Sequence, residues 1–144
     1  GIISGLHELI RRINKSGTIK VSLSHHDIPA RLNEVGEISL YRIIQEFLSN
    51  TIKHSTASRV TLDFTGFDTE VVLTIEDDGI GYSLEQFQNS EGNGWRNINS
   101  RLNLIKGNIE LDIVEGRKNN TVIISVPFAS LKRIGSEREP ALKN

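Results

Sequence analysis

The chain has 144 residues, and its 17 Lys and Arg against 18 Asp and Glu give a formal net charge of −1. Without a basic excess we expect no direct binding to nucleic acid, because such binding depends on neutralising phosphates. The sequence contains no cysteine, which excludes disulfide scaffolds, thiolate zinc sites and cysteine nucleophiles. Its longest apolar runs have the size of strands, well below the ~20 residues of a membrane-spanning helix, so we expect a soluble domain.

Hydrophobic periodicity predicts the elements in chain order. Apolar residues spaced three and four apart predict helices, and alternating or β-branched runs predict strands. The predicted elements are a helix over 4–16, a strand over 18–24, a helix over 37–55, a hairpin over 59–65 and 70–76, a helix over 95–106 and a second hairpin over 108–114 and 121–126. The tail over 129–144 carries charge and Pro140 and has no periodicity, so we expect it to be disordered. Strand pairs mixed with helices favour an α/β two-layer sandwich, with helices on one face of a sheet.

The long helix carries a polar strip beside its apolar stripe. At about 100° per residue, Glu46, Asn50 and Lys53 fall within one narrow sector. A carboxylate, a carboxamide oxygen and an ammonium placed in this way suit a hydrated Mg²⁺ and the phosphates that it bridges. The alternative is an ordinary solvated helix face. His54 falls inside the apolar sector, where it is by itself more typical of a core histidine than of a ligand.

The first hairpin ends in an acidic, glycine-containing segment. Asp77 stands at the end of the strand, and Gly79 and Gly81 follow it. An Asp at a strand end can accept a hydrogen bond from an exocyclic amine, and glycines let the backbone approach a flat ring closely. The alternative is a plain Asp-Gly turn, which is common.

A second glycine-containing segment, Gly92-Asn93-Gly94, precedes the third helix. Free N–H groups at a helix start suit phosphate, although a flexible loop would have the same composition. The residues between Gly81 and Gly92 are numerous enough for a short lid. The sequence lacks the P-loop motif, the third glycine of a Rossmann fingerprint, the His-Glu-x-x-His zinc motif and the Gly-x-Ser-x-Gly elbow. The absence of these motifs excludes P-loop and Rossmann nucleotide-binding sites, and zinc and serine hydrolase chemistry.

Residues 45–54, 77–81 and 92–98, in this order, closely resemble the N, G1 and G2 boxes of the ATP-binding catalytic domain of two-component sensor histidine kinases. That family shares its fold with gyrase, MutL and the large ATP-dependent chaperones, and the resemblance covers 18–128. It implies a mixed, mainly antiparallel five-stranded sheet with about three helices on one face. It also implies a protein histidine kinase that binds Mg-ATP and donates the γ-phosphoryl group to a histidine on an adjoining domain, with little activity expected from the fragment alone.

The resemblance implies a role for each matched residue. Asn50 coordinates Mg²⁺, Glu46 assists proton transfer as the catalytic residue, and Lys53 contacts phosphate. Asp77 accepts a hydrogen bond from the adenine amino group. The remaining predicted nucleotide-binding residues lie in the three boxes, and they are His54 in the N box, Gly79 and Gly81 on the adenine floor, and Gly92, Asn93 and Gly94 at the hinge of the lid.

The same resemblance suggests a domain plan and a set of partners. Too few residues separate His7 from the binding helix for His7 to be the phosphoacceptor, so 1–16 is interpreted as the end of the second helix of a dimerisation hairpin. The ATP-binding domain then covers 17–128, before the tail. We expect the chain's own dimerisation and phosphoacceptor domain, a response regulator and a homodimer as partners. We also expect a cytoplasmic domain, whose parent protein a membrane anchor could hold.

Some residues depart from the family pattern. Trp95 stands where many relatives carry Leu, Asn120-Thr121 stands where many carry Gly-Thr, and Phe87 is the one candidate for a phenylalanine of the lid. Two other functions stay open. One is an anti-sigma-factor serine kinase on the same fold, and the other is an interaction module that no longer uses ATP.

Overall fold

Five strands pair in the order β1-β2-β3-β5-β4 in the computed structural model, which describes residues 1–134. The elements are α1 (Ile2–Lys15), β1 (Lys20–His26), α2 (Glu34–His54), β2 (Arg59–Gly66), β3 (Glu70–Asp77), α3 (Leu84–Asn89), α4 (Gly94–Leu104), β4 (Asn108–Asp112), β5 (Asn120–Pro127) and a 3-10 turn, Phe128–Ser130. Strand β1 is parallel to β2, and the other three pairs are antiparallel. The predicted mixed, mainly antiparallel sheet is therefore confirmed.

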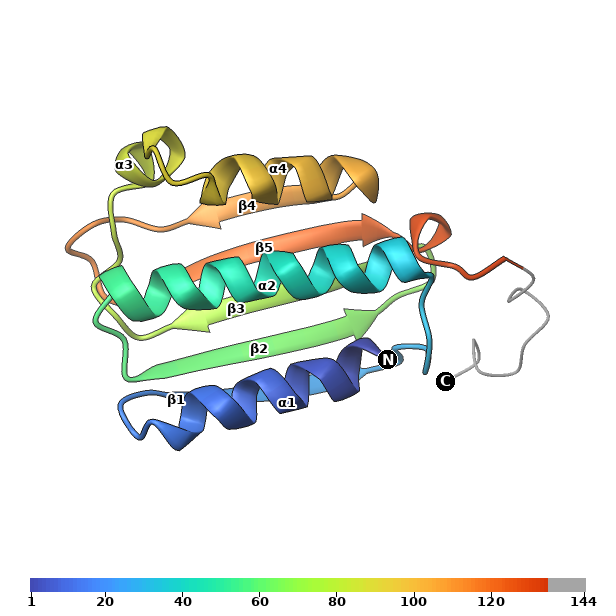
Figure 1. Cartoon of the computed structure of the whole chain (residues 1–144), viewed down its shortest axis with the longest axis horizontal. Helices are drawn as coiled ribbons and strands as arrows, with labels where there is room; N and C mark the ends of the chain where they lie inside the picture. The colour runs from blue at the N-terminus through green and yellow to red at the C-terminus, as the bar shows by residue number, and fades with distance from the viewer. Residues whose placement is uncertain (135–144) are drawn as a thin grey trace.

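Helices α1, α2 and α4 lie side by side over one face of this sheet, which confirms the predicted two-layer sandwich (Figure 1). A fourth helix, α3, lies within the segment between Gly81 and Gly92, where the sequence predicts a short lid and no helix. Its Ser83 hydroxyl caps the helix by accepting from the Gln86 amide at 3.1 Å, and only Phe87 is buried. Such a short helix cannot show a helical repeat in its sequence. Within residues 1–134, no helix is both long and apolar enough to cross a membrane.

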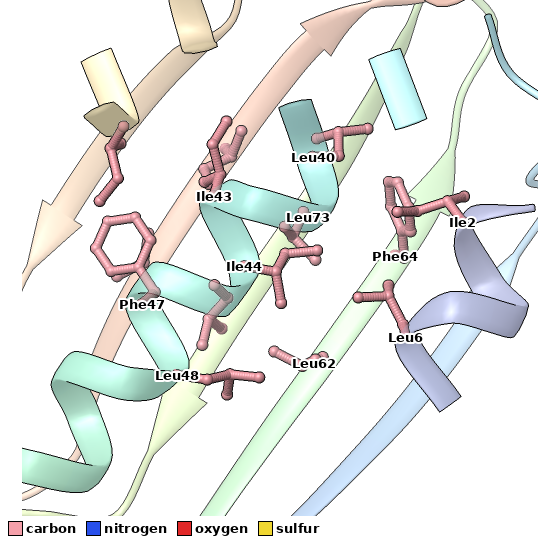
Figure 2. Close-up of a cluster of buried hydrophobic side chains, with 14 of the residues drawn as sticks. Ile2, Leu6, Leu40, Ile43, Ile44, Phe47, Leu48, Leu62, Phe64 and Leu73 are labelled. Atoms are coloured by element: carbon pink, nitrogen blue, oxygen red, sulfur yellow. The ribbon is translucent and has the colours of Figure 1, made fainter. Parts of the chain in front are cut away.

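Helix α2 supplies the centre of the core. Its side chains Leu40, Ile43, Ile44, Phe47 and Leu48 are almost fully buried against the strands (Figure 2). Burial of each such side chain stabilises the fold by about 1.5–3 kcal/mol. The helix begins three residues earlier than predicted, because the Asn33 side chain caps it by accepting from the Gly36 amide at 2.7 Å.

Helix α1 shares this core. Ile2, Leu6, Leu9 and Ile10 are buried with the residues of α2 and the sheet, and Leu6 lies beside Phe64 in Figure 2. The domain boundary predicted at residue 17 therefore does not separate two cores. That α1 continues an upstream hairpin stays a prediction.

The first part of the predicted tail is ordered. Leu131 is fully buried, and it lies against Gly36 at the start of α2. The Asn33 side chain donates to the carbonyls of Ser130 and Lys132 at 2.9 and 3.1 Å. The expectation of disorder is therefore wrong for 129–134, because one apolar anchor and one capping side chain hold a segment that has no periodicity of its own. Residues 135–144 lie outside the described part of the chain.

Candidate functional site

A pocket of about 380 Å³ lies where the last turns of α2, the turn after β3 and helix α3 meet. Helix α2 contributes Asn50 and His54 to its wall. The turn contributes Ile80, Gly81 and Tyr82. Helix α3 closes another side, and the β4–β5 loop adds one carboxylate, that of Glu115. Segments that are far apart in the sequence thus form one cavity.

The Asp77 carboxylate is held next to this wall. Its Oδ1 accepts from the Ser55 hydroxyl at 2.8 Å and from the Gly79 amide at 2.9 Å. The Ser55 Oγ in turn accepts from the Gly81 amide at 3.1 Å. Asp77 does not itself line the cavity, but a single hydroxyl joins its carboxylate to the backbone of Gly81, which does. Ser55 is the C-cap residue of α2, so its hydrogen bonds to Asp77 and Gly81 connect the end of the N-box helix to the G1 box.

Tyr82 directly follows the G1 box in the sequence, and it lines the same pocket as Asn50 of the N box. Burial raises the pKa of its hydroxyl to about 12, the neighbouring Asn50 carboxamide acts in the opposite direction, and the Asp77 carboxylate raises the pKa further. Within residues 1–134, the Tyr82 hydroxyl and Asn50 Nδ2 are the two buried side-chain atoms without a hydrogen-bond partner. An unpaired buried polar group costs about 1–3 kcal/mol. A ligand that supplied partners in this pocket would recover that cost.

The predicted polar strip of α2 is divided between two cavities. Asn50 and His54 line the main pocket, and His54 is exposed, so the alternative of a core histidine is wrong. Glu46 lines a smaller cavity of about 250 Å³ between α2 and α4, together with Arg42 and Arg101. Lys53 is exposed and belongs to neither wall.

The G2 segment meets α2 at one point. A Cβ placed on Gly94 would lie 2.7 Å from Glu46 Oε2, so the Glu46 carboxylate lies against the first residue of α4. Gly92 and Asn93 are exposed, and they line a third cavity of about 310 Å³ on the other side of the lid segment. The structure therefore brings Gly94 to Glu46, but it does not bring Gly92 or Asn93 to Asn50.

An aromatic cluster anchors α3. The Phe87 ring packs against Phe47, Tyr82 and Trp95, with ring centroids 6.1, 5.7 and 5.8 Å apart. The pairs with Tyr82 and Trp95 are edge-on and the pair with Phe47 is tilted, and such aromatic pairs stabilise beyond the area that they bury. Phe87 thus holds the lid segment to the core and to the start of α4.

Sequence reasoning missed three polar residues of the site, namely Ser55, Tyr82 and Asn120. Ser55 follows the N box directly, and its burial beside Asp77 depends on the packing of α2 on β3. Asn120 appeared only as a departure from the family pattern, yet it is 1% exposed and bonded to the turn after Asp77. The one signal in the sequence that could have identified these residues is that each is a polar side chain next to a box or to a residue that departs from the family pattern.

Comparisons with known proteins agree with this fold. Residues 35–130 match the family model of the histidine kinase-, DNA gyrase B-, and HSP90-like ATPase. The chain is 31% identical over 118 residues to sensor histidine kinase ComP of Bacillus subtilis, which covers 81% of this chain and 15% of that protein. It is 30% identical over 142 residues to sensor histidine kinase LiaS of the same organism, which covers 99% of this chain and 38% of that protein.

A solved structure shows the same fold. The histidine kinase domain of the Erythrobacter litoralis EL346 blue-light activated histidine kinase superposes with a TM-score of 0.75 at 18% identity, over 89% of this chain and 61% of that one. The chain spans less than two fifths of the length of ComP and LiaS. Since the family model covers well over half of its residues, the chain belongs to the histidine kinase-, DNA gyrase B-, and HSP90-like ATPase family.

Proposed function

We propose that this chain binds Mg-ATP and presents the γ-phosphoryl group to a histidine on an adjoining dimerisation domain of a two-component sensor histidine kinase. One observation carries the proposal. Asn50 on α2 and the turn that follows Asp77 meet at one pocket, whose wall also contains Tyr82. Phosphoryl transfer needs mainly positioning and charge neutralisation, which such a pocket can supply.

The hydrogen bonds of Asp77 support adenine as the base. Oδ1 is occupied by Ser55 and Gly79, so the carboxylate is fixed and its second oxygen is available as an acceptor. An acceptor at this place favours the amino group of adenine over the carbonyl oxygen of guanine. We therefore assign Gly79 and Gly81 to the adenine floor.

The donor set fits Mg²⁺ bound mainly by phosphates and water. No group of three or more His, Cys, Asp or Glu side chains within 1–134 could hold a metal ion, so a cage built from protein ligands alone does not fit. Mg²⁺ instead retains waters and uses one or two protein oxygens. Asn50 would supply one oxygen, and Glu46 stands one turn away on α2. When bound, the ion neutralises charge on the phosphates.

The remaining predicted residues keep their roles as proposals. Glu46 would take or hold a proton near the start of α4, where Gly94 lies against its carboxylate. Lys53 would contact phosphate, and Gly92 and Asn93 would form the hinge of the lid. We also propose the expected partners, namely the phosphoacceptor domain, a second copy in a homodimer and a response regulator, together with a cytoplasmic location.

Calorimetric titration with ATP in the presence of Mg²⁺ tests this function. The wild type should bind, and both Asn50→Ala and Asp77→Asn should weaken binding about tenfold or more, because each removes a charge-assisted or buried polar contact. Asp78→Asn is the matched control. Asp78 is the adjacent carboxylate, but it is bonded to Ser58 and to the Arg59 amide. Equal affinities in all four proteins would overturn these assignments, and failure of the wild type to bind would favour the interaction module.

A further inference from the structure

A buried asparagine holds the turn that forms the pocket floor. Asn120 is the first residue of β5, is 1% exposed and pairs with Asp77 across the β3–β5 ladder. Its Nδ2 donates to the carbonyls of Gly79 at 3.2 Å and Arg117 at 3.0 Å, and its Oδ1 accepts from the Val114 amide at 2.9 Å. Both amide protons and the oxygen are therefore used, as a buried carboxamide requires.

The β4–β5 loop fits tightly against the same turn. The Gly116 amide donates to the carbonyl of Ile80 at 2.7 Å. Gly81 has a φ of 71°, and a Cβ there would lie 2.4 Å from the carbonyl oxygen of Val114 and 3.1 Å from Asn120 Nδ2. Ile80 and Gly81, which line the pocket, thus rest directly on the loop that Asn120 organises.

We propose that Asn120 is a positioning residue for base recognition, an inference that rests on the proposed nucleotide binding. Asn120 does not line the pocket, so it acts through Gly79 and Gly81. Its carboxamide fixes the carbonyl of Gly79, whose amide in turn bonds to the Asp77 carboxylate. The direction in which Asp77 offers its remaining oxygen therefore depends on Asn120.

The arrangement separates base recognition from metal binding. Removal of the Asn120 side chain leaves the Val114 amide without its acceptor and the Gly79 carbonyl without one donor. The Asn119 and Gly116 amides still donate to the carbonyls of Gly79 and Ile80, but the turn is held less firmly, and the contact between Asp77 and the base weakens. Asn50 lies on α2 and makes no hydrogen bond to Asn120, Gly79 or Gly81, so the metal and phosphate contacts remain.

Titration of three proteins with ATP and with GTP, both in the presence of Mg²⁺, tests the inference. The measurements are made at low temperature, where all three are folded. Asn120→Ala should bind ATP about tenfold more weakly and should discriminate less between ATP and GTP, because buried hydrogen bonds are lost. The midpoint of a Mg²⁺ titration at saturating ATP should not change. Leu6→Ala is the control, because it loses core packing away from the pocket and should retain both affinities.

Each result has a separate meaning. If the wild type does not bind ATP, the proposed function is overturned. If the wild type binds and Asn120→Ala has the same affinity and the same discrimination, or differs from the wild type no more than Leu6→Ala does, the positioning role is overturned.

Hydrogen exchange in the wild type without nucleotide gives a test that needs no variant. The Val114 amide, which donates to Asn120 Oδ1, should exchange as slowly as the amides of the β3–β5 ladder. Fast exchange at Val114 beside a protected ladder would show that the network is not formed in advance, and it would overturn the proposal.

Discussion

Asp77 and Asp78 are neighbouring carboxylates with different partners. Asp77 bonds to Ser55 at the pocket, whereas Asp78 accepts from the Ser58 hydroxyl at 2.6 Å and from the Arg59 amide at 2.9 Å. The sequence places both in one acidic turn and cannot distinguish them. The pairing of β3 with its neighbours sets Asp77 opposite Val60 and Asn120, whereas Asp78 lies beyond the strand and is bonded to Ser58 and Arg59. We therefore propose the ligand contact for Asp77 and not for Asp78.

Asp78 should make stability depend on pH in the acid range. The Ser58 hydroxyl, followed by the Arg59 amide, lowers its pKa from 3.8 to about 2. A lowered pKa in the folded state contributes stability that is present above the unfolded pKa and is lost as pH falls through the folded one. The free energy of unfolding of Asp78→Asn, measured with urea, should therefore fall less between about pH 4 and pH 2 than that of the wild type.

A companion variant checks the cause. Ser58→Ala removes the largest contribution to the lowered pKa and should reproduce part of the flatter acid profile. If the dependence of stability on pH in both variants matched that of the wild type, this account of Asp78 would be contradicted.

Gly79 and Gly92 should respond differently to an added methyl group. A Cβ on Gly79 would lie 2.2 Å from the backbone oxygen of Ser55, which cannot move without displacing the end of α2, whereas nothing lies within 4 Å at Gly92. Gly79→Ala should lower the free energy of unfolding by about 1–3 kcal/mol or more, as overpacking does. Gly92→Ala should leave it within about 0.5 kcal/mol. Equal urea midpoints for the two variants would contradict the tight fit at Gly79.

At the scale of elements, α1 contributes to the core of the domain. Leu6 is fully buried, so Leu6→Ala should lower the free energy of unfolding by about 2–5 kcal/mol. Ser4→Ala is the matched control on the same helix, because Ser4 is exposed, and it should change stability by less than about 0.5 kcal/mol. Urea unfolding measures both. A loss at Leu6 no larger than that at Ser4 would mean that α1 packs elsewhere in solution.

Helix α3 should depend on a single ring. Phe87→Ala removes contacts to Phe47, Tyr82 and Trp95, the only tryptophan of the chain. Trp95 emission should shift to the red as solvent reaches the indole, and the amides of α3 should exchange faster. Phe67→Ala is the control, because Phe67 is 56% exposed. Unchanged emission in Phe87→Ala would contradict the anchoring role.

The sequence predicted the long elements well and the short ones poorly. The apolar stripe of α2 and the two hairpins are long enough for periodicity to register, and their observed bounds differ from the prediction by only a few residues. Helix α3 and the turn after Pro127 are too short for periodicity to register. The Ser83 cap and the buried Phe87 define α3, and the buried Leu131 directly follows the turn. Ser55 and Asn120 were missed for a related reason, since tertiary contacts alone give them a role.

At the scale of the whole molecule, the sandwich depends on residues outside the range of the resemblance. A fragment of residues 17–128 would lack Ile2, Leu6, Leu9 and Ile10 as well as Leu131, all of which are buried. Each is worth about 1.5–3 kcal/mol, and a whole domain has only about 5–15 kcal/mol of stability. Circular dichroism should therefore show 17–128 largely unfolded under conditions in which 1–134 is folded. A cooperative thermal transition for 17–128 would contradict this.

The contact of Leu131 with Gly36 gives a practical position for a reporter group. It fixes the segment around Lys132 to the first turn of α2, whereas Asn50 stands near the last turns of the same helix. At 1.5 Å per residue, the two ends are separated by roughly 20 Å. A dye attached to the exposed side chain of Lys132 would therefore stay clear of the pocket while remaining tied to the helix that forms part of its wall.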